Sequence, residues 1–176
     1  MPSPVNEWLG RDAASQLRQW PRIDDLAESV SGSPLLAGLL LLGSFARGDA
    51  DWLSDVDFIV VVESGGFEEA WARRDDLHGD GVICWDYPRP GRREVAAHRW
   101  LTEDFVLFDG LIATVAGTRI ADPFVVLVGE PGLADRMGRF DPTAKGGNEI
   151  EPHEIERLYG QLKLAARRTK EVTRCR

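Results

Sequence analysis

Apolar residues gather in short runs along this chain, and glycine, proline or small polar residues bound each run. The four main runs occupy residues 35–42, 55–62, 105–115 and 124–128. Short runs rich in Val, Ile, Leu and Phe are typical of buried β-strands. We therefore predict a strand at each of the four runs, and a shorter strand at 82–85.

Three other stretches, 5–30, 67–78 and 152–172, carry apolar residues at helical spacing. Pro21 is expected to divide the first stretch into two helices, because proline interrupts a helix interior. The predicted inward-facing residues are Trp8, Leu9, Leu17, Trp20, Ile23, Leu26 and Val30 in the first stretch and Phe67, Ala70, Trp71 and Leu77 in the second. Residues 44–54, with room for one helical turn, and 129–148 are predicted loops. Helices and strands are mixed along the chain, which predicts an α+β fold.

The 176 residues are 43% hydrophobic and 28% charged, which is enough for one folded domain with a sizeable core. The formal net charge is -8. This balance disfavours a nucleic acid as partner, because binding a phosphate backbone needs clustered Lys and Arg. An acidic surface suits a metal–nucleotide complex, a cationic small molecule or a basic protein partner.

The cysteine count and the hydropathy pattern bear on location. Cys84 and Cys175 are too few for a disulfide framework, which favours a reducing compartment. The apolar run at 35–42 is far shorter than the roughly 20 residues that span a bilayer. The first residues do not resemble a signal peptide. We therefore expect a cytoplasmic protein with no membrane partner.

Two acidic residues open the apolar run at 55–62. Side chains alternate along a strand, so Asp55 and Asp57 share one face while Val56 and Phe58 point into the core. Neighbouring carboxylates repel each other unless a cation lies between them. Because magnesium typically binds one or two carboxylates together with substrate phosphates, the pair predicts part of a magnesium site.

Gly43 and Ser44 directly follow the apolar run at 35–42. A glycine after a buried strand permits a tight turn and close approach of the backbone. The serine then offers a hydroxyl and a backbone N–H at the start of a helical turn, a position suited to an anion. Phosphate at Ser44 and metal at the two acids is the arrangement that a nucleoside triphosphate needs.

The order of these residues resembles the signature of the DNA polymerase β-type nucleotidyltransferase superfamily. Gly43 and Ser44 are followed by ten residues and then by Asp55, Val56 and Asp57. The stretch 43–50, with Ser54 just before Asp55, is similar to the minimal nucleotidyltransferases and antibiotic adenylyltransferases of that superfamily. The resemblance covers about residues 35–128. It implies a small mixed sheet flanked by helices, two magnesium ions, and transfer of a nucleoside monophosphate with loss of pyrophosphate.

This resemblance also divides the chain. We expect one domain overall, made of an N-terminal helical segment at 1–34, a nucleotidyltransferase core at 35–130, and a loop with a C-terminal helix at 131–176. The carboxylate-bearing strand at 55–62 would lie near the centre of the core. The two outer segments would contribute helices around it.

The family carries a third acid on a later strand. Asp109 is the best match, because it is the only acid inside the apolar run at 105–115. An ionisable group there costs several kcal/mol unless a metal or a partner satisfies it. Asp86 is the alternative, although it is predicted to lie at a strand end, where an acid is unremarkable. Glu103 and Asp104 are predicted to be exposed turn residues.

The family mechanism assigns a role to each candidate residue. Asp55 and Asp57 would hold the two magnesium ions, and Ser44 would hold the β- or γ-phosphate of ATP or another nucleoside triphosphate. Asp109 would ligate the second metal and accept the proton of an acceptor hydroxyl. Arg47 is a weaker candidate for a contact with the triphosphate, since an arginine in a polar loop is more often solvated.

The histidines and the first cysteine are expected to have no part in this chemistry. His78, His98 and His153 lack the spacing and the acidic partners of a zinc site, so a surface or satisfied side chain is expected for each. Cys84 lies in an apolar stretch and is expected to be a buried, inert thiol.

Two acceptors are compatible with the resemblance. A small hydroxyl-bearing molecule, as in aminoglycoside or lincosamide adenylyltransferases, is favoured by the long span from Asp57 to Asp109 and by the acidic surface. Against it, those enzymes usually carry a larger helical C-terminal domain, whereas one helix is predicted after the last strand here. Binding of that acceptor would then need a homodimer, or the acceptor is not a small molecule. The alternative is a minimal nucleotidyltransferase antitoxin, which binds a helical toxin protein and nucleotidylates it. A non-catalytic binding protein is disfavoured by the three acids.

Overall fold

The computed structural model of the protein describes residues 17–79, 82–88 and 94–141. Contacts between Cα atoms divide the chain into Met1–Phe140 and Asp141–Arg176, and the described strands belong to the first unit. The predicted helix at 152–172, with His153 and Cys175, lies outside the described residues. The proposed membership of 1–34 and 131–176 in one domain with the core stays a prediction.

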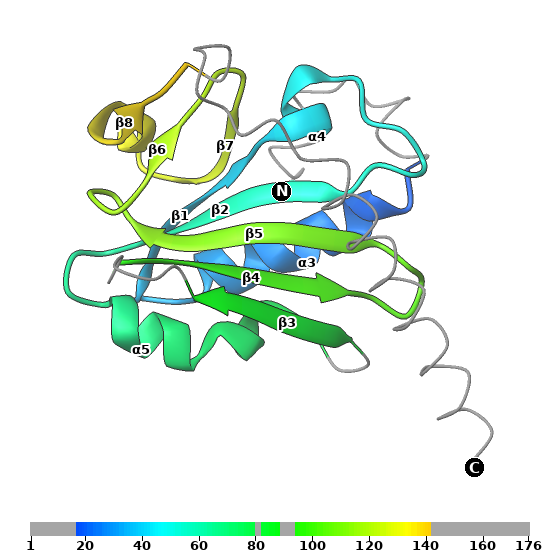
Figure 1. Ribbon diagram of the computed structural model, residues 1–176, viewed down its shortest axis with the longest axis horizontal. Helices are drawn as coiled ribbons and strands as arrows, with labels where there is room; N and C mark the ends of the chain where they lie inside the picture. Colours follow the sequence, from blue (N-terminus) through cyan, green and yellow to red (C-terminus); the bar gives the residue numbers. More distant parts are fainter. Residues whose placement is uncertain (1–16, 80–81, 89–93, 142–176) are drawn as a thin grey trace, which may run out of the picture. The chain divides into compact units, whose positions relative to one another are not determined.

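The centre of the fold is a mixed sheet of six strands in the order β3-β4-β5-β2-β1-β7 (Figure 1). The strands are β1 (Leu36–Leu41), β2 (Val56–Val62), β3 (Ile83–Pro88), β4 (Val95–Leu101), β5 (Leu107–Thr114) and β7 (Val125–Gly129). Strands β2 and β5 are parallel and the other neighbours are antiparallel. A separate pair is formed by β6 (Arg119–Ile120) and β8 (Gly138–Arg139). The predicted α+β fold and all five predicted strands are confirmed.

Strand β4 was not predicted, and its sequence explains why. The segment Val95–Leu101 contains two consecutive alanines, a histidine and an arginine, which are weak indicators of a strand. It nevertheless pairs along its whole length with β3 on one side and β5 on the other. Pairing on both edges therefore outweighs its low intrinsic preference for extended structure.

The two faces of the sheet form separate hydrophobic cores. On one face, Val56, Phe58 and Trp100 are buried in a cluster with residues of α3 (Gln19–Ser31) and α5 (Phe67–Ala72). On the other face, Ile59 and Val61 pack with Leu133 of the 3₁₀ helix η2 (Leu133–Arg136). Alternation along β2 therefore directs Val56 and Phe58 inward, as predicted, and sends Asp57 to the opposite face.

Helix α3 contains Pro21 instead of ending at it. The helix begins at Gln19, so Pro21 lies in the first turn, where its missing N–H is not needed. The predicted division at Pro21 is therefore wrong for the described part of the helix, whereas the burial of Trp20, Ile23, Leu26 and Val30 is confirmed. No helix among the described residues is long and apolar enough to cross a membrane.

The second predicted helix is shorter than expected. Helix α5 ends at Ala72, and the chain continues as a 3₁₀ helix, η1 (Arg74–Leu77). Phe67, Ala70 and Leu77 are buried as predicted, and Trp71 is partly buried against the same core. His78 directly follows η1, and its ring contacts that of Trp100 on β4.

Candidate active site

Gly43 is the first residue of the short helix α4 (Gly43–Arg47), which follows β1, and it lies against the side chain of Asp57. The backbone N–H of Leu42 donates to the Asp57 carbonyl oxygen at 2.9 Å, which holds the two strands together at this point. Gly43 has a φ of 59°, a left-handed conformation that favours glycine. A Cβ atom there would collide with the Asp57 carboxylate. Both the backbone angle and the available space therefore require glycine.

The predicted carboxylates come together beside the start of β2. Asp57 and Asp109 are register partners in the parallel pair β2–β5, so their side chains leave the same face of the sheet on adjacent strands. Asp55 lies two residues before Asp57. Burial, and then the negative charges of Asp55 and Asp109, raise the pKa of Asp57 to about 6. This cluster of like charges is an environment that a bound cation would relieve.

Two arginines partly compensate this negative charge. The Arg99 Nε donates to Asp109 Oδ1 at 2.6 Å, so the carboxylate on the apolar strand has a cationic partner within the protein. Its position therefore does not by itself require a metal. Arg47 forms an ion pair with Asp49 at 3.1 Å. The positive charges of Arg47 and Arg99 act on Asp57, but they lower its pKa by less than burial and the neighbouring acids raise it.

The loop before Asp55 is held by local hydrogen bonds and by one residue of α3. The Ser54 hydroxyl donates to Asp51 Oδ1 and accepts from the Asp51 backbone N–H, both at 2.9 Å. The buried Gln19 side chain then donates its Nε2 to the carbonyl oxygens of Asp51, Trp52 and Ser54 at 3.0, 3.3 and 2.8 Å. Gln19 therefore positions the segment that delivers Asp55, a role that helical spacing did not reveal.

Asp86, the alternative third acid, lies on the opposite face of the sheet from Asp109. It is inside β3, where a strand end was predicted, and it pairs in register with His98. Asp109 pairs with Arg99, and consecutive residues of a strand face opposite sides. The register thus brings Asp109, and not Asp86, beside Asp57.

Two expectations about the histidines and Cys84 are wrong. His98 does have an acidic partner, because its Nδ1 lies 2.7 Å from Asp86 Oδ1. His78, Cys84 and His98 also come together in the fold, although their sequence spacing does not indicate it. Cys84 is exposed, because it lies on the edge strand β3 and not in the interior of the sheet.

The comparisons with known proteins agree with this geometry. Residues 23–107, close to half of the chain, match the family of nucleotidyltransferase domains. The matched stretch contains Gly43, Ser44, Asp55 and Asp57 and ends two residues before Asp109. No curated protein matches the chain at a significant level.

The mixed sheet, the acids on its parallel strand pair and the family match together define a transferase of nucleotidyl groups. The matched stretch is a nucleotidyltransferase domain of the DNA polymerase β-type superfamily. The resemblance that Gly43, Ser44, Asp55 and Asp57 indicated is thereby confirmed.

The donor set around Asp57 fits a hard divalent cation. Carboxylate oxygens are the ligands that magnesium prefers. Burial beside two further acids leaves the Asp57 carboxylate with an elevated pKa, so that its ionised form gains from a cation. Gly43 keeps the space next to that carboxylate free of a side chain.

Proposed function

We propose that the protein transfers a nucleoside monophosphate, AMP from ATP, to a hydroxyl group of a small molecule in a magnesium-dependent reaction. The observation that carries the proposal is the register pairing of Asp57 with Asp109 beside Gly43, within a nucleotidyltransferase domain. Two magnesium ions would be held by Asp55, Asp57 and Asp109. When bound, they would stabilise the charge that develops on the phosphoryl group during transfer.

The protein's own residues then bind and orient the substrates. The Ser44 hydroxyl would donate to a β- or γ-phosphate oxygen, and the glycine before it allows the backbone to approach that phosphate. Arg47 is close enough to Asp57 to influence its pKa and would contact the triphosphate from the end of α4. The Asp109 carboxylate would accept the proton of the acceptor hydroxyl, which makes that oxygen a better nucleophile.

The acceptor is proposed to be a cationic small molecule of the aminoglycoside or lincosamide kind. The net charge of -8 favours a positively charged acceptor over a nucleic acid. Partly exposed Trp85 shares the register position of Arg99, and therefore the face that carries the acids, so it is available for contact with a base or an acceptor ring. With two cysteines and no disulfide framework, we propose a cytoplasmic location.

Label transfer tests the reaction and its acceptor together. The full-length protein is incubated with Mg²⁺ and ATP labelled at the α-phosphate, either alone, with a panel of aminoglycosides and lincosamides, or with a helical protein encoded beside its gene. Label on a small molecule supports the proposal. Label on the helical protein supports the alternative, a nucleotidyltransferase antitoxin. No transfer in any arm, with protein that unfolds cooperatively, contradicts both.

Matched acid variants test the assignment of the site. Asp57→Asn and Asp109→Asn are each expected to reduce transfer by at least about 100-fold, because each removes a carboxylate from the proposed metal site. Asp86→Asn removes an acid from the opposite face and is expected to leave the rate within about threefold of the wild type. If Asp86→Asn abolishes transfer and Asp109→Asn does not, the third-carboxylate assignment is wrong.

A further inference from the structure

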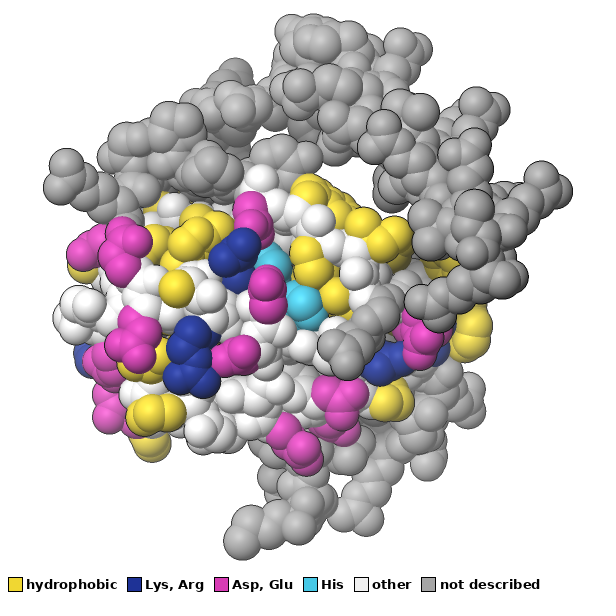
Figure 2. Space-filling model, turned by 90° about the horizontal axis from the view of Figure 1, so that it is seen from below, with side chains coloured by type: hydrophobic (Ala, Val, Ile, Leu, Met, Phe, Trp, Pro, Cys, Tyr) yellow, Lys and Arg dark blue, Asp and Glu magenta, His cyan; other side chains and the backbone are white. Residues whose placement is uncertain are grey.

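Three potential metal ligands converge on the side of the sheet opposite the acids. His78 directly follows η1, Cys84 is on the edge strand β3 and His98 is on β4. One ligand atom from each residue lies within 4.8 Å of the others. Figure 2 views the molecule from the edge where β3 and α5 lie in Figure 1, and histidine side chains are visible there among acidic and basic ones.

Both histidines are oriented by a hydrogen bond from their Nδ1 atom. The Nδ1 of His78 lies 3.2 Å from the Gly79 carbonyl oxygen, which can only accept. The Nδ1 of His98 lies 2.7 Å from the Asp86 carboxylate, which Arg74 holds in place at 2.8 Å. In each ring Nδ1 therefore carries the hydrogen, and the Nε2 nitrogen has a lone pair that can accept a hydrogen bond or bind a metal. Metal-binding histidines typically have this arrangement, with a carbonyl or carboxylate behind the ring.

The Nε2 atoms of His78 and His98 differ in their hydrogen-bond partners. His78 Nε2 lies 3.1 Å from the Cys84 sulfur. His98 Nε2 is buried and has no hydrogen-bond partner in the part of the chain that the structure describes, although the side chain is only 1% exposed. A buried polar atom without a partner is costly, and a bound cation would satisfy it.

We propose that His78, Cys84 and His98 bind a zinc ion. Two imidazole nitrogens and a thiolate are a typical zinc ligand set, softer than the carboxylates that suit magnesium. Ligand atoms around tetrahedral zinc are separated by about 3.4–3.6 Å, so side-chain adjustments of about an ångström bring the three into place. On binding, the Cys84 thiol loses its proton to solvent and the sulfur forms the metal bond. Water would complete the fourth position.

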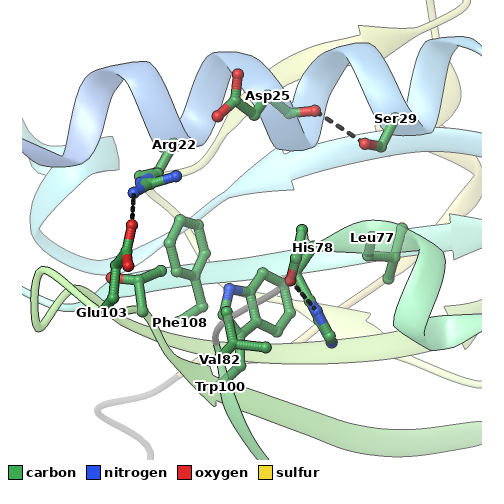
Figure 3. Close-up of a pocket in the computed structure, with 11 residues that line it drawn as sticks. Arg22, Asp25, Ser29, Leu77, His78, Val82, Trp100, Glu103 and Phe108 are labelled. Carbon is green, nitrogen blue, oxygen red and sulfur yellow. Dashed lines mark hydrogen bonds and ion pairs between the residues drawn. The ribbon is translucent and has the colours of Figure 1, made fainter.

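This zinc site is separate from the proposed magnesium site. Cys84 and His98 are on the face that carries Trp100, whereas Asp57, Asp109 and Arg99 are on the other. The ion would fasten the end of η1 to the edge of the sheet. His78 and Trp100 also line a small cavity beside α3, in which Arg22 and Glu103 form an ion pair (Figure 3). Because the two sites lie on opposite faces of the sheet, loss of zinc binding and loss of nucleotidyl transfer are distinguishable.

Cobalt provides an optical test, because a bond between Co²⁺ and a thiolate gives a charge-transfer band in the near ultraviolet. The reduced, chelator-treated full-length protein is titrated with CoCl₂ and then with ZnCl₂. We expect one equivalent of Co²⁺ to bind with this band, and Zn²⁺ to displace it. Cys84→Ser should lose the band, and His78→Gln and His98→Gln should each weaken binding by at least about tenfold.

Matched controls replace residues other than the three proposed ligands. Cys175→Ser, His153→Gln and Asp57→Asn should keep both the band and the affinity. Asp86→Asn should keep the band but weaken binding by roughly 10–100-fold, since it removes only the group behind His98. Zn²⁺ should raise the unfolding temperature of the wild type and not that of Cys84→Ser, whose exposed side chain makes a folding defect unexpected. Absence of binding by the wild type, or a band that survives Cys84→Ser, overturns the proposal.

Discussion

At the residue scale, Gly43 and Asp57 depend on each other. The positive φ of Gly43 directs the chain from β1 into α4, and the missing side chain leaves room for the carboxylate. Gly48, at the other end of α4, has a similar φ of 77°, but a Cβ atom added there would meet no other atom within 4 Å. The two glycines therefore share a backbone requirement and differ only in the contact with Asp57.

Replacing Gly43 by alanine should reduce nucleotidyl transfer by roughly 100-fold, because the new methyl group displaces the Asp57 carboxylate. Both Gly43→Ala and Gly48→Ala should lower the free energy of unfolding by about 1–2 kcal/mol, the cost of a side chain in the left-handed region. Transfer rates and urea unfolding curves of both variants check this. A rate loss of similar size in Gly48→Ala would contradict the specific role of Gly43.

The raised pKa of Asp57 predicts a pH-dependent effect of its removal. A carboxyl whose pKa is higher in the folded state than in the unfolded state binds its proton more tightly when folded. In the metal-free protein, its ionisation therefore reduces stability as the pH rises from about 4 through about 6. With EDTA present, Asp57→Asn should raise the unfolding temperature above pH 6 by roughly 2–4 °C and lose this advantage near pH 4.

Asp86 provides a control, because its removal is expected to change the unfolding temperature in the opposite direction. Burial acts to raise its pKa, but the hydrogen bonds from His98 and Arg74 outweigh burial and lower it. Its contribution to stability is therefore present at neutral pH and lost as the pH falls. Asp86→Asn should lower the unfolding temperature at neutral pH, where Asp57→Asn raises it. Thermal unfolding of both variants across the pH range, with EDTA present, measures these changes. If both variants shift the unfolding temperature in the same direction at neutral pH, the pKa directions given for Asp57 and Asp86 are wrong.

At the scale of single elements, most strands could be predicted because their apolar runs are continuous and end at glycine or polar residues. Strand β4 could not, because its strand character depends on pairing with β3 and β5 and not on its own residues. Because β4 was not predicted, the contact between His98 and Asp86 was not predicted either. The acids of β2 were predictable because strand alternation is local, whereas the contact between Arg99 and Asp109 depends on the register of β4 against β5.

Helix α3 contributes to the site through Gln19, whose amide binds three carbonyl groups of the loop before Asp55. Gln19→Leu should leave these partly buried acceptors without the amide donor and lower the free energy of unfolding by about 1–3 kcal/mol. We expect faster hydrogen exchange at residues 51–55 and a transfer rate reduced by roughly tenfold. Ser29→Ala, which removes a hydroxyl bonded only within α3, is the control and should change neither.

At the scale of the whole molecule, the two faces of one sheet carry two different groups of potential metal ligands. The acids near the start of β2 share their face with Arg99, and the histidines and Cys84 share theirs with the aromatic core. The fold class could be predicted from the order of a few residues, and the same residues carry the proposal of a magnesium site. The cluster of His78, Cys84 and His98 could not be predicted, since the position of His78 after η1 and the pairing of β3 with β4 bring these residues together.

The described strands all belong to the unit that ends at Phe140, so a shortened chain of residues 1–141 should fold. It contains both strands of the parallel pair and every candidate ligand described above. We expect cooperative urea unfolding and a far-ultraviolet circular dichroism spectrum with the β-sheet contribution of the full chain. A non-cooperative transition would mean that residues 142–176 are needed for the sheet to form.

The ring of Trp100 lies 5.2 Å from that of His78 and 5.3 Å from that of His98. Excited indole rings are readily quenched by neighbouring imidazolium groups and are sensitive to the charge around them. Trp100 is therefore a built-in fluorophore for this corner of the molecule, and its emission should respond to whatever occupies the histidine pair. The difference between the emission of the wild type and that of Trp100→Phe isolates this signal, so the state of the site can be followed in solution without an added dye.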